Sequence, residues 1–182
     1  MRLKFLLLVL SIASCAPGRN LPLLPAEPAA EYRLGAGDVV RLITFGEEAL
    51  TGEFRVADNG AIAVPLIGSI RAAGATPQGL EAAVGAALVR GRMLRNPSVS
   101  AEIVVYRPIF VLGEVNKPGQ YPYQSGMTVV TAVAVAGGFT YRAIESYASV
   151  VRTTDGQAIE GKALRQSFIR PGDVITIFER RF

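Results

Sequence analysis

An apolar run and a segment of alternating apolar and polar residues predict two strands in the first half of the chain. Residues 39–45 form an apolar run that is entered from a glycine-rich turn at 35–38. No Gly-Lys-Ser/Thr follows this turn, so it is not the phosphate-binding loop of a nucleotide site. In residues 98–106, apolar and polar side chains alternate over most of the segment, which is typical of a strand with one buried face.

A hairpin is predicted between these two strands. Asp58-Asn59-Gly60 is a strong turn signal, because Asn and Gly tolerate the positive φ that tight hairpin turns require. It predicts that residues 53–56 pair with residues 61–64. A further strand over residues 67–73 is expected to end at Gly74.

One amphipathic helix is predicted over residues 77–90. Thr76 is a good N-cap, and Pro77 suits the first helical position because its fixed φ is already helical. The apolar side chains of one face are Leu80, Ala83, Val84, Ala87 and Leu88. Their spacing of three and four residues places them on one side of the helix, which we expect to pack on the sheet.

A second hairpin is predicted at the start of the second half. Residues 109–115 form an apolar strand, and a second short strand ends at Tyr121-Pro122-Tyr123. The intervening residues 116–119 predict a type II turn. In it, Pro118 presets φ at the first central position, and Gly119 supplies the positive φ that the next position needs.

A helix, another hairpin and a last strand complete this second unit. Residues 128–138 are rich in β-branched side chains, which favours a strand. Their length, threonine cap and terminal glycine pair favour a helix, and we predict a helix. A hairpin joins residues 149–152 to 157–160, and a final strand covers residues 174–178. Hairpin, helix, hairpin and last strand is the order of a β-grasp domain.

Short glycine turns precede strands near both ends of the chain. Gly37-Asp38-Val39 and Gly172-Asp173-Val174 are similar entries from a turn into a strand, although the similarity is too short to indicate a repeat. The glycines that we expect to serve backbone geometry rather than chemistry are Gly35, Gly37, Gly113, Gly119 and Gly172.

The composition excludes most familiar catalytic sites. The 182 residues contain no histidine, and Cys15 is the only cysteine. A Ser-His-Asp triad, a Cys-His pair and a zinc site of His or Cys ligands are therefore excluded, and we expect no cofactor and no enzymatic activity. The carboxylates that an acid–base pair for glycoside cleavage would need are Glu47, Glu48, Glu53 and Asp58. Nothing in the sequence brings two of them together, so solvated turn residues are the simpler interpretation.

The N-terminal residues predict export from the cytoplasm. The apolar segment 5–13 follows Arg2 and Lys4 and is about half as long as a helix that spans a bilayer, as in a signal peptide. The formal charge of +4 includes these two basic residues, and the rest of the chain has 17 basic and 15 acidic residues, a net charge of +2.

A loose basic cluster lies where the predicted helix ends. Its members are Arg90, Arg92 and Arg95. Basic side chains at a helix C-terminus interact favourably with the helix dipole. No aromatic residue lies between the arginines, so the helix dipole explains them better than a nucleic acid does.

Residues 12–15, Ile-Ala-Ser-Cys, resemble the lipobox of bacterial lipoproteins. The resemblance implies that residues 1–14 are a removable lipoprotein signal peptide and that Cys15 is the site of lipid attachment. Ala16 follows it, where an aspartate would imply retention in the inner membrane, so the outer membrane is implied. Residues 15–30 contain several prolines and are expected to form an extended spacer.

A series of short segments links the chain to one family. In the first half they are YRLGAGDV (32–39), DNG (58–60), VPLIG (64–68) and NPSV (96–99). In the second half they are VLGEV (111–115), PGQY (118–121), AGGFT (136–140) and RPGDV (170–174). The first group resembles the export domain of the bacterial polysaccharide biosynthesis/export family, the outer-membrane lipoproteins of the Wza type. The second group resembles the SLBB (soluble-ligand-binding β-grasp) domain of that family.

The resemblance implies an α+β protein of two tandem small domains, an export domain at 31–107 and a β-grasp SLBB domain at 108–182. It also implies a lipid-anchored homo-oligomer on the periplasmic face of the outer membrane. Its ring would pass capsular polysaccharide or exopolysaccharide across that membrane. The implied partner is an inner-membrane polysaccharide co-polymerase, often linked to a tyrosine kinase.

One departure from the family concerns the pore. Long members carry a C-terminal amphipathic helix that lines the pore in the outer membrane, whereas this sequence ends at residues 179–182, directly after the last predicted strand. We therefore expect that another outer-membrane protein completes the pore.

Aromatic faces and guanidinium groups suit carbohydrate binding. The side chains that we expect to contact saccharide are Tyr121, Tyr123, Tyr141 and Arg142. The competing hypothesis is a monomeric β-grasp lipoprotein that captures a saccharide or another small ligand without conducting a polymer.

Overall fold

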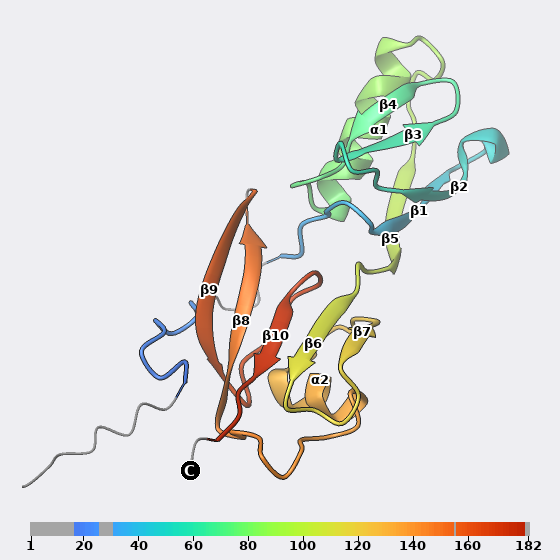
Figure 1. Ribbon diagram of the computed structural model, residues 1–182. Helices are drawn as coiled ribbons and strands as arrows, with labels where there is room; N and C mark the ends of the chain where they lie inside the picture. Colours follow the sequence, from blue (N-terminus) through green and yellow to red (C-terminus); the bar gives the residue numbers. More distant parts are fainter. Residues whose placement is uncertain (1–16, 26–30, 155, 181–182) are drawn as a thin grey trace, which may run out of the picture.

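The computed structural model describes residues 17–25, 31–154 and 156–180. They form two domains arranged end to end in an elongated molecule (Figure 1). The expected α+β class with two tandem domains is confirmed. The predicted signal peptide, residues 1–14, and Cys15 lie outside the described residues. In the part of the chain that the structure describes, no helix is both long and apolar enough to cross a membrane.

A three-stranded antiparallel sheet forms one layer of the first domain. Its strands, in the order β2-β1-β5, are β2 (Gly52–Arg55), β1 (Val39–Thr44) and β5 (Val99–Val105). The short 3-10 helix η1 (Glu48–Leu50) joins β1 to β2. Every second residue of β1 is buried, so the predicted strand places one face in the core.

The predicted helix is confirmed as α1 (Pro77–Arg90). Thr76 caps it, since its hydroxyl oxygen accepts a hydrogen bond of 3.0 Å from the Gly79 N–H. The residues of α1 that are buried are Leu80, Val84 and Leu88. They pack against the sheet and against the hairpin described next, and together these elements enclose the first core.

The predicted pairing of residues 53–56 with 61–64 is wrong. Strand β3 (Ala61–Val64) pairs with β4 (Gly68–Arg71), while β2 pairs with β1. The Asp58-Asn59-Gly60 turn does form, but the Gly60 carbonyl accepts hydrogen bonds from Ala72 and Ala73, just after β4. The turn is therefore attached to the end of β4, and this directs β3 to β4 rather than to β2.

The second domain has the predicted β-grasp topology. Its sheet has the order β7-β6-β10-β8-β9, in which β10 runs parallel to β6 and the other neighbours are antiparallel. The strands are β6 (Ile109–Gly113), β7 (Gly119–Tyr121), β8 (Tyr147–Thr154), β9 (Gln157–Leu164) and β10 (Val174–Ile177). Helix α2 (Val129–Val135) lies across one face of this sheet (Figure 1).

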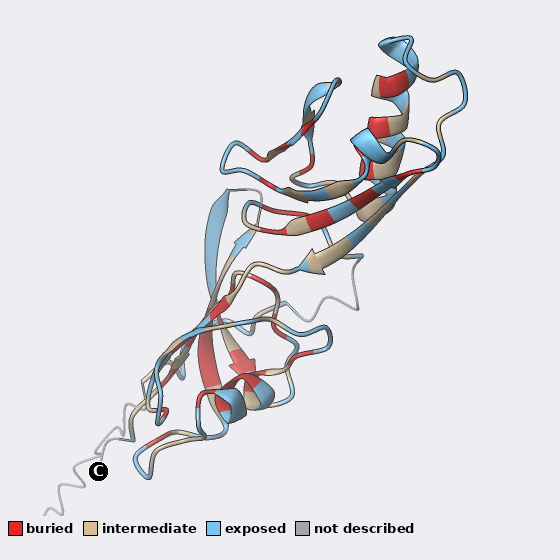
Figure 2. Ribbon diagram, turned by 90° about the vertical axis from the view of Figure 1, so that its right-hand side faces the viewer, coloured by how far each residue is buried: buried red, intermediate tan, exposed pale blue. Residues whose placement is uncertain are grey.

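The segment with mixed strand and helix signals is thus a helix, as predicted. Thr128 and Thr131 form a capping box, in which each side chain bonds to the backbone N–H of the other residue. The inner face of α2 is buried against the sheet. Figure 2 shows the two layers of buried residues, one on the helix and one on the strands that it covers.

The predicted type II turn at residues 116–119 is wrong. Gly119 does not have a positive φ, and it is the first residue of β7, paired with Val111. The positive φ lies earlier, at Gly113, with a value of 81°. The connection is wider than a tight turn because Asn116 is held by residues after α2. Its N–H donates to Gly138, and its side-chain amide donates to Gly137.

Residues 17–25 do not form a free extended spacer. The Leu24 N–H donates to the carbonyl of Lys162 at 2.8 Å, and the Lys162 N–H donates to the carbonyl of Pro22 at 2.7 Å. The Tyr147 hydroxyl also donates to the carbonyl of Pro17. Strand β9 has an open edge, and this segment pairs with part of it, so the proline-rich stretch is attached to the second domain.

Candidate functional site

The two Gly-Asp-Val segments form equivalent turns at the junction between the domains. Asp38 and Asp173 are buried, with exposed fractions of 0% and 1%. Each carboxylate accepts a hydrogen bond from the N–H three residues earlier, from Gly35 at 2.8 Å and from Arg170 at 2.7 Å. Asp38 precedes β1 and Asp173 precedes β10. The short sequence similarity therefore corresponds to the same turn, with a buried aspartate before a strand, in both domains.

Arg107 connects these two turns. Its backbone N–H donates to Asp38 Oδ1 at 2.8 Å, and its Nη1 lies 3.9 Å from Asp38 Oδ2. From the same side chain, Nε donates to the Pro171 carbonyl at 2.9 Å. The Gly172 N–H donates to the carbonyl of Pro108, the residue that follows Arg107. One arginine thus contacts a buried carboxylate of the first domain and a turn of the second.

The space for the Arg107 side chain depends on glycines from both domains. A Cβ atom on Gly35 would lie 1.4 Å from Arg107 Nη1, and one on Gly172 would lie 3.0 Å from its Nε. Gly172 also has a φ of 87°, which favours glycine. The expectation that these two glycines serve backbone geometry is therefore supported, and the close approach of an arginine is the reason.

A row of three tyrosines crosses the same junction. The rings of Tyr32 and Tyr106 are 5.1 Å apart, and those of Tyr106 and Tyr123 are 5.4 Å apart, both in edge-to-face geometry. The Tyr32 hydroxyl donates to Asp38 Oδ2 at 2.6 Å. Burial and this bond to the carboxylate raise the pKa of Tyr32 well above its ordinary value, and burial raises the pKa of Tyr123. Both phenols therefore remain neutral at physiological pH.

Asp173 has its own guanidinium partner. Arg152 Nε donates to Oδ1 at 3.0 Å and its Nη2 donates to Oδ2 at 2.7 Å, a bidentate pair. Asp38 in turn accepts from Tyr32, Gly35 and Arg107. Both buried carboxylates are thus fully hydrogen-bonded, an arrangement that suits a structural joint rather than acid–base chemistry.

The four predicted saccharide contacts do not share one site. Tyr123 is half-buried in the row of tyrosines, and the Tyr121 hydroxyl donates to the carbonyl of Lys117. Tyr141 is 87% exposed, and Arg142 forms an ion pair with Glu179. Glu179 follows the end of β10 whereas the junction lies before its start, so these last two residues lie at the far end of the second domain from Tyr123.

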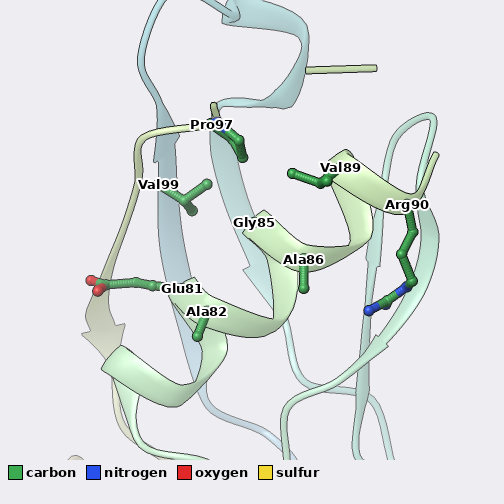
Figure 3. A pocket seen from close by; sticks show the side chains of 8 residues that line it. All are labelled: Glu81, Ala82, Gly85, Ala86, Val89, Arg90, Pro97 and Val99. Atoms are coloured by element: carbon green, nitrogen blue, oxygen red, sulfur yellow. The ribbon is translucent and has the colours of Figure 1, made fainter. Parts of the chain in front are cut away.

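A shallow groove runs along the outer side of α1 (Figure 3), with a volume of about 570 Å³. It is lined by Glu81, Ala82, Gly85, Ala86, Val89, Arg90, Pro97 and Val99. The Glu81 carboxylate accepts a hydrogen bond from the Ala101 N–H of β5, so the acidic residue in the lining is already engaged. What remains is a mostly apolar surface on the first domain.

The importance of Arg107 could not be seen from the sequence. It lies 69 residues from Asp38 along the chain, and the intervening pattern contains no signal that pairs them. The similar Gly-Asp-Val turns were the available signal, because a buried aspartate before a strand needs donors. The sequence does not say which arginine supplies them.

Comparison with known proteins agrees with this two-domain architecture. The family model described as polysaccharide biosynthesis/export protein matches residues 26–104, and the SLBB domain model matches residues 108–161. The exopolysaccharide production protein ExoF of Rhizobium meliloti (strain 1021) is 33% identical over 145 residues, which cover 74% of this chain and 33% of that protein.

A second relative carries the word export in its name. The EPS I polysaccharide export outer membrane protein EpsA of Ralstonia nicotianae is 26% identical over 176 residues, which cover 81% of this chain and 45% of that protein. This chain thus spans less than half the length of either relative. The two domain matches follow one another in the order of the two folded units, and both relatives are polysaccharide proteins. The chain therefore belongs to the polysaccharide biosynthesis/export family and carries an SLBB domain as its second domain.

Proposed function

We propose that this chain is a lipoprotein on the periplasmic face of the outer membrane and that copies of it form a ring for polysaccharide export. The names of the relatives support the export of an exopolysaccharide, and the name of EpsA supports the outer membrane. The signal-peptide pattern at 1–14 and the lipobox-like residues that end at Cys15 support the lipid anchor. The polymer, capsular or secreted, is the substrate, and no chemical step on it is proposed.

The observation that carries this proposal is the junction around Arg107. A wall of a conduit needs subunits that keep their shape along the path of the polymer. Here a buried carboxylate, a guanidinium and a row of tyrosines connect the two domains. A fully satisfied polar network and packed aromatic rings make the junction between the two domains rigid. The two domains therefore suit one subunit of a ring.

Residues 17–25, which pair with β9, suggest how the subunit is oriented relative to the membrane. Pro17 lies beside Tyr147, and a Cβ on Gly18 would meet the ring of Phe178, just after β10. Cys15 is two residues before Pro17, a span of at most about 7 Å. The lipid would therefore attach near the end of the second domain that is remote from the junction, and the first domain would extend away from the membrane.

Partners and sugar contacts follow from this orientation. The first domain would face the inner-membrane polysaccharide co-polymerase and its tyrosine kinase. Among the candidate saccharide contacts, Tyr141 and Arg142 have exposed side chains, and in the proposed orientation both would lie at the membrane end. Tyr121 and Tyr123 are engaged in packing within one chain. We propose that sugar contact is made mainly by the exposed pair.

The test is complementation of a strain that lacks this gene. Full export of polymer is expected from the wild-type gene and little from Cys15→Ser, because the protein is then not anchored. Membrane fractionation and immunoblotting check that the variant is made but released. Light scattering and negative-stain images of the detergent-extracted lipoprotein should show a closed ring. A persistent monomer with a one-to-one saccharide titration would replace the export ring with the binding-module hypothesis.

A further inference from the structure

The outer side of α1 is unusually apolar for a helix at the surface. Its exposed positions include Ala82, Ala86 and Val89, and Val89 is 48% exposed. A helix that faces water normally carries charged or polar residues on that side. Together with Gly85, Pro97 and Val99 these residues form the groove of Figure 3, a shallow apolar surface with room for a bulky side chain.

The C-terminal end of this groove is strongly basic. Arg90, Arg92 and Arg95 are all exposed, and within the described residues none of them forms an ion pair or donates a side-chain hydrogen bond. The helix dipole accounts for one cation at the end of α1. Three guanidinium groups with no ion pair within the described residues, next to an apolar groove, suit a partner that carries carboxylates.

A complementary feature lies at the end of β1 in the same domain. Phe45 is 85% exposed, an extreme value for a phenylalanine. Glu47 and Glu48 follow it, and neither carboxylate has an ion pair in the part of the chain that the structure covers. This loop thus presents an apolar side chain next to two uncompensated negative charges. The groove presents an apolar hollow next to three positive ones.

The side chain of Phe45 does not fill the groove of its own chain, since it is 85% exposed. Phe45 follows the last residue of β1, and its N–H donates to the carbonyl of Ser98 at 3.0 Å, next to the groove residues Pro97 and Val99. The groove lies on the α1 side, beside the edge strand β5. The groove can therefore accept this loop from a second copy. In the proposed ring the contact is head-to-tail, so that each copy gives its loop to one neighbour and its groove to the other.

We infer that the groove of α1 binds the 45–48 loop of a second copy of this chain. The phenyl ring of Phe45 occupies the apolar groove, while Glu47 and Glu48 pair with the arginine cluster. Opposite charges around the apolar contact set its direction and register. The inference rests on the proposed ring and names the surfaces by which its subunits meet.

A disulfide trap tests the contact on the intact lipoprotein in cells. The variant combines Phe45→Cys with Ala86→Cys, and the oxidising periplasm allows the two to join. We expect a ladder of covalent dimers, trimers and larger species on a non-reducing gel. Either single substitution should give no ladder, and neither should the control pair Gln120→Cys with Ala86→Cys, because Gln120 is exposed on the second domain.

The outcomes separate this inference from the proposed ring. If the ladder is absent while the wild-type protein still forms a ring in detergent, the subunits meet through other surfaces and the inference is overturned. If the wild-type protein is monomeric at every concentration, the ring and this contact both fail. Covalent dimers without larger species would show a symmetric contact, which also contradicts the head-to-tail arrangement.

Charge reversal is a second test that does not depend on cysteine chemistry. Glu47→Lys with Glu48→Lys is expected to weaken association by about tenfold, and Arg90→Glu with Arg92→Glu by a similar factor. All four changes together should restore association, since the charges are again opposite. All of these side chains are exposed or half-exposed, so the fold should be retained. Two impaired pairs with no recovery in the combined variant would refute the proposed pairing.

Discussion

Replacing Arg107 by alanine should uncouple the two domains. The substitution removes the hydrogen bond from its Nε to the Pro171 carbonyl, at 2.9 Å, and the guanidinium that lies 3.9 Å from Asp38. The backbone N–H of residue 107 still reaches Asp38, so the buried carboxylate keeps its three donors. The loss is therefore that of the side chain alone.

The magnitude follows from these contacts. A hydrogen bond from a charged donor contributes about 1.5–3 kcal/mol. The ion pair is long and the arginine side chain is 27% exposed, so solvent screening limits the pair to below about 1 kcal/mol. We expect the free energy of unfolding to fall by about 2–3 kcal/mol. In calorimetry, a single cooperative transition should split into two, one for each domain.

Urea denaturation and calorimetry of the purified chain measure both effects. The matched control is Arg33→Ala, because Arg33 also donates to a backbone carbonyl, that of Gly74, but lies at the surface within the first domain. It should cost less than about 1 kcal/mol and leave the transition unsplit. A loss below about 0.5 kcal/mol for Arg107→Ala, with one transition, would refute the coupling role of this residue.

A double-mutant cycle tests the geometry itself. In Gly35→Ala the new Cβ would lie 1.4 Å from Arg107 Nη1, so the guanidinium must move and give up its bond to Pro171. A cost of about 2 kcal/mol is expected in the wild type. In the Arg107→Ala background the space is empty and the same change should cost little, which gives a coupling energy of about 2 kcal/mol. Additive effects would contradict the contact.

Three further predictions concern other parts of the chain. The raised pKa of Tyr32 means that the folded state holds the phenolic proton more tightly, so stability should fall as pH rises above about 10, and Tyr32→Phe should remove part of this fall. Gly113→Ala should destabilise by about 3 kcal/mol or more, since φ is positive and the Cβ would lie 2.1 Å from the Ile177 carbonyl oxygen. Gly161→Ala would place a Cβ 3.0 Å from Leu24 and should speed proteolysis within residues 17–25, with the urea midpoint nearly unchanged.

Each of these predictions has a matched control. Tyr141→Phe changes an exposed tyrosine and should leave the alkaline loss of stability as it is. Gly46→Ala has a similar positive φ of 79° with open space around it, so it isolates the backbone strain from the clash at Gly113. Gly119→Ala meets nothing closer than 3.9 Å and should not affect proteolysis near the N-terminus. A Gly113→Ala protein as stable as Gly46→Ala would show that the clash is relieved.

Local signals predicted the elements whose causes are local. The helix α1 follows from the Thr76 cap and the spacing of its apolar side chains, and its bounds agree with residues 77–90. The second helix was also predicted correctly, since its caps outweigh its β-branched content. Capping and periodicity act within a few residues, so a sequence pattern contains all the information that these elements need.

Pairing between distant segments was harder to predict. The Asp58-Asn59-Gly60 turn was identified correctly, but its strand partner was not, because the Gly60 carbonyl bonds to residues after β4. The docking of residues 17–25 on β9 has the same origin, since a proline-rich stretch carries no sign of the edge that it meets. The predicted saccharide contacts were chosen by residue type, and the fold distributes them over both ends of the second domain.

The position of the two equivalent turns explains how the contacts of Arg107 can fix the sheets of the two domains relative to each other. Asp38 precedes β1, the central strand of the sheet β2-β1-β5, and Asp173 precedes β10, the central strand of β7-β6-β10-β8-β9. Arg107 contacts both turns, so it fixes the starts of the two central strands rather than two edges. A central strand is hydrogen-bonded to a neighbouring strand on each side. A force that acts on it is therefore transmitted to its whole sheet. If copies of the chain associate through the first domain while a lipid holds the second, Arg107 lies on the path that connects the ring to the membrane.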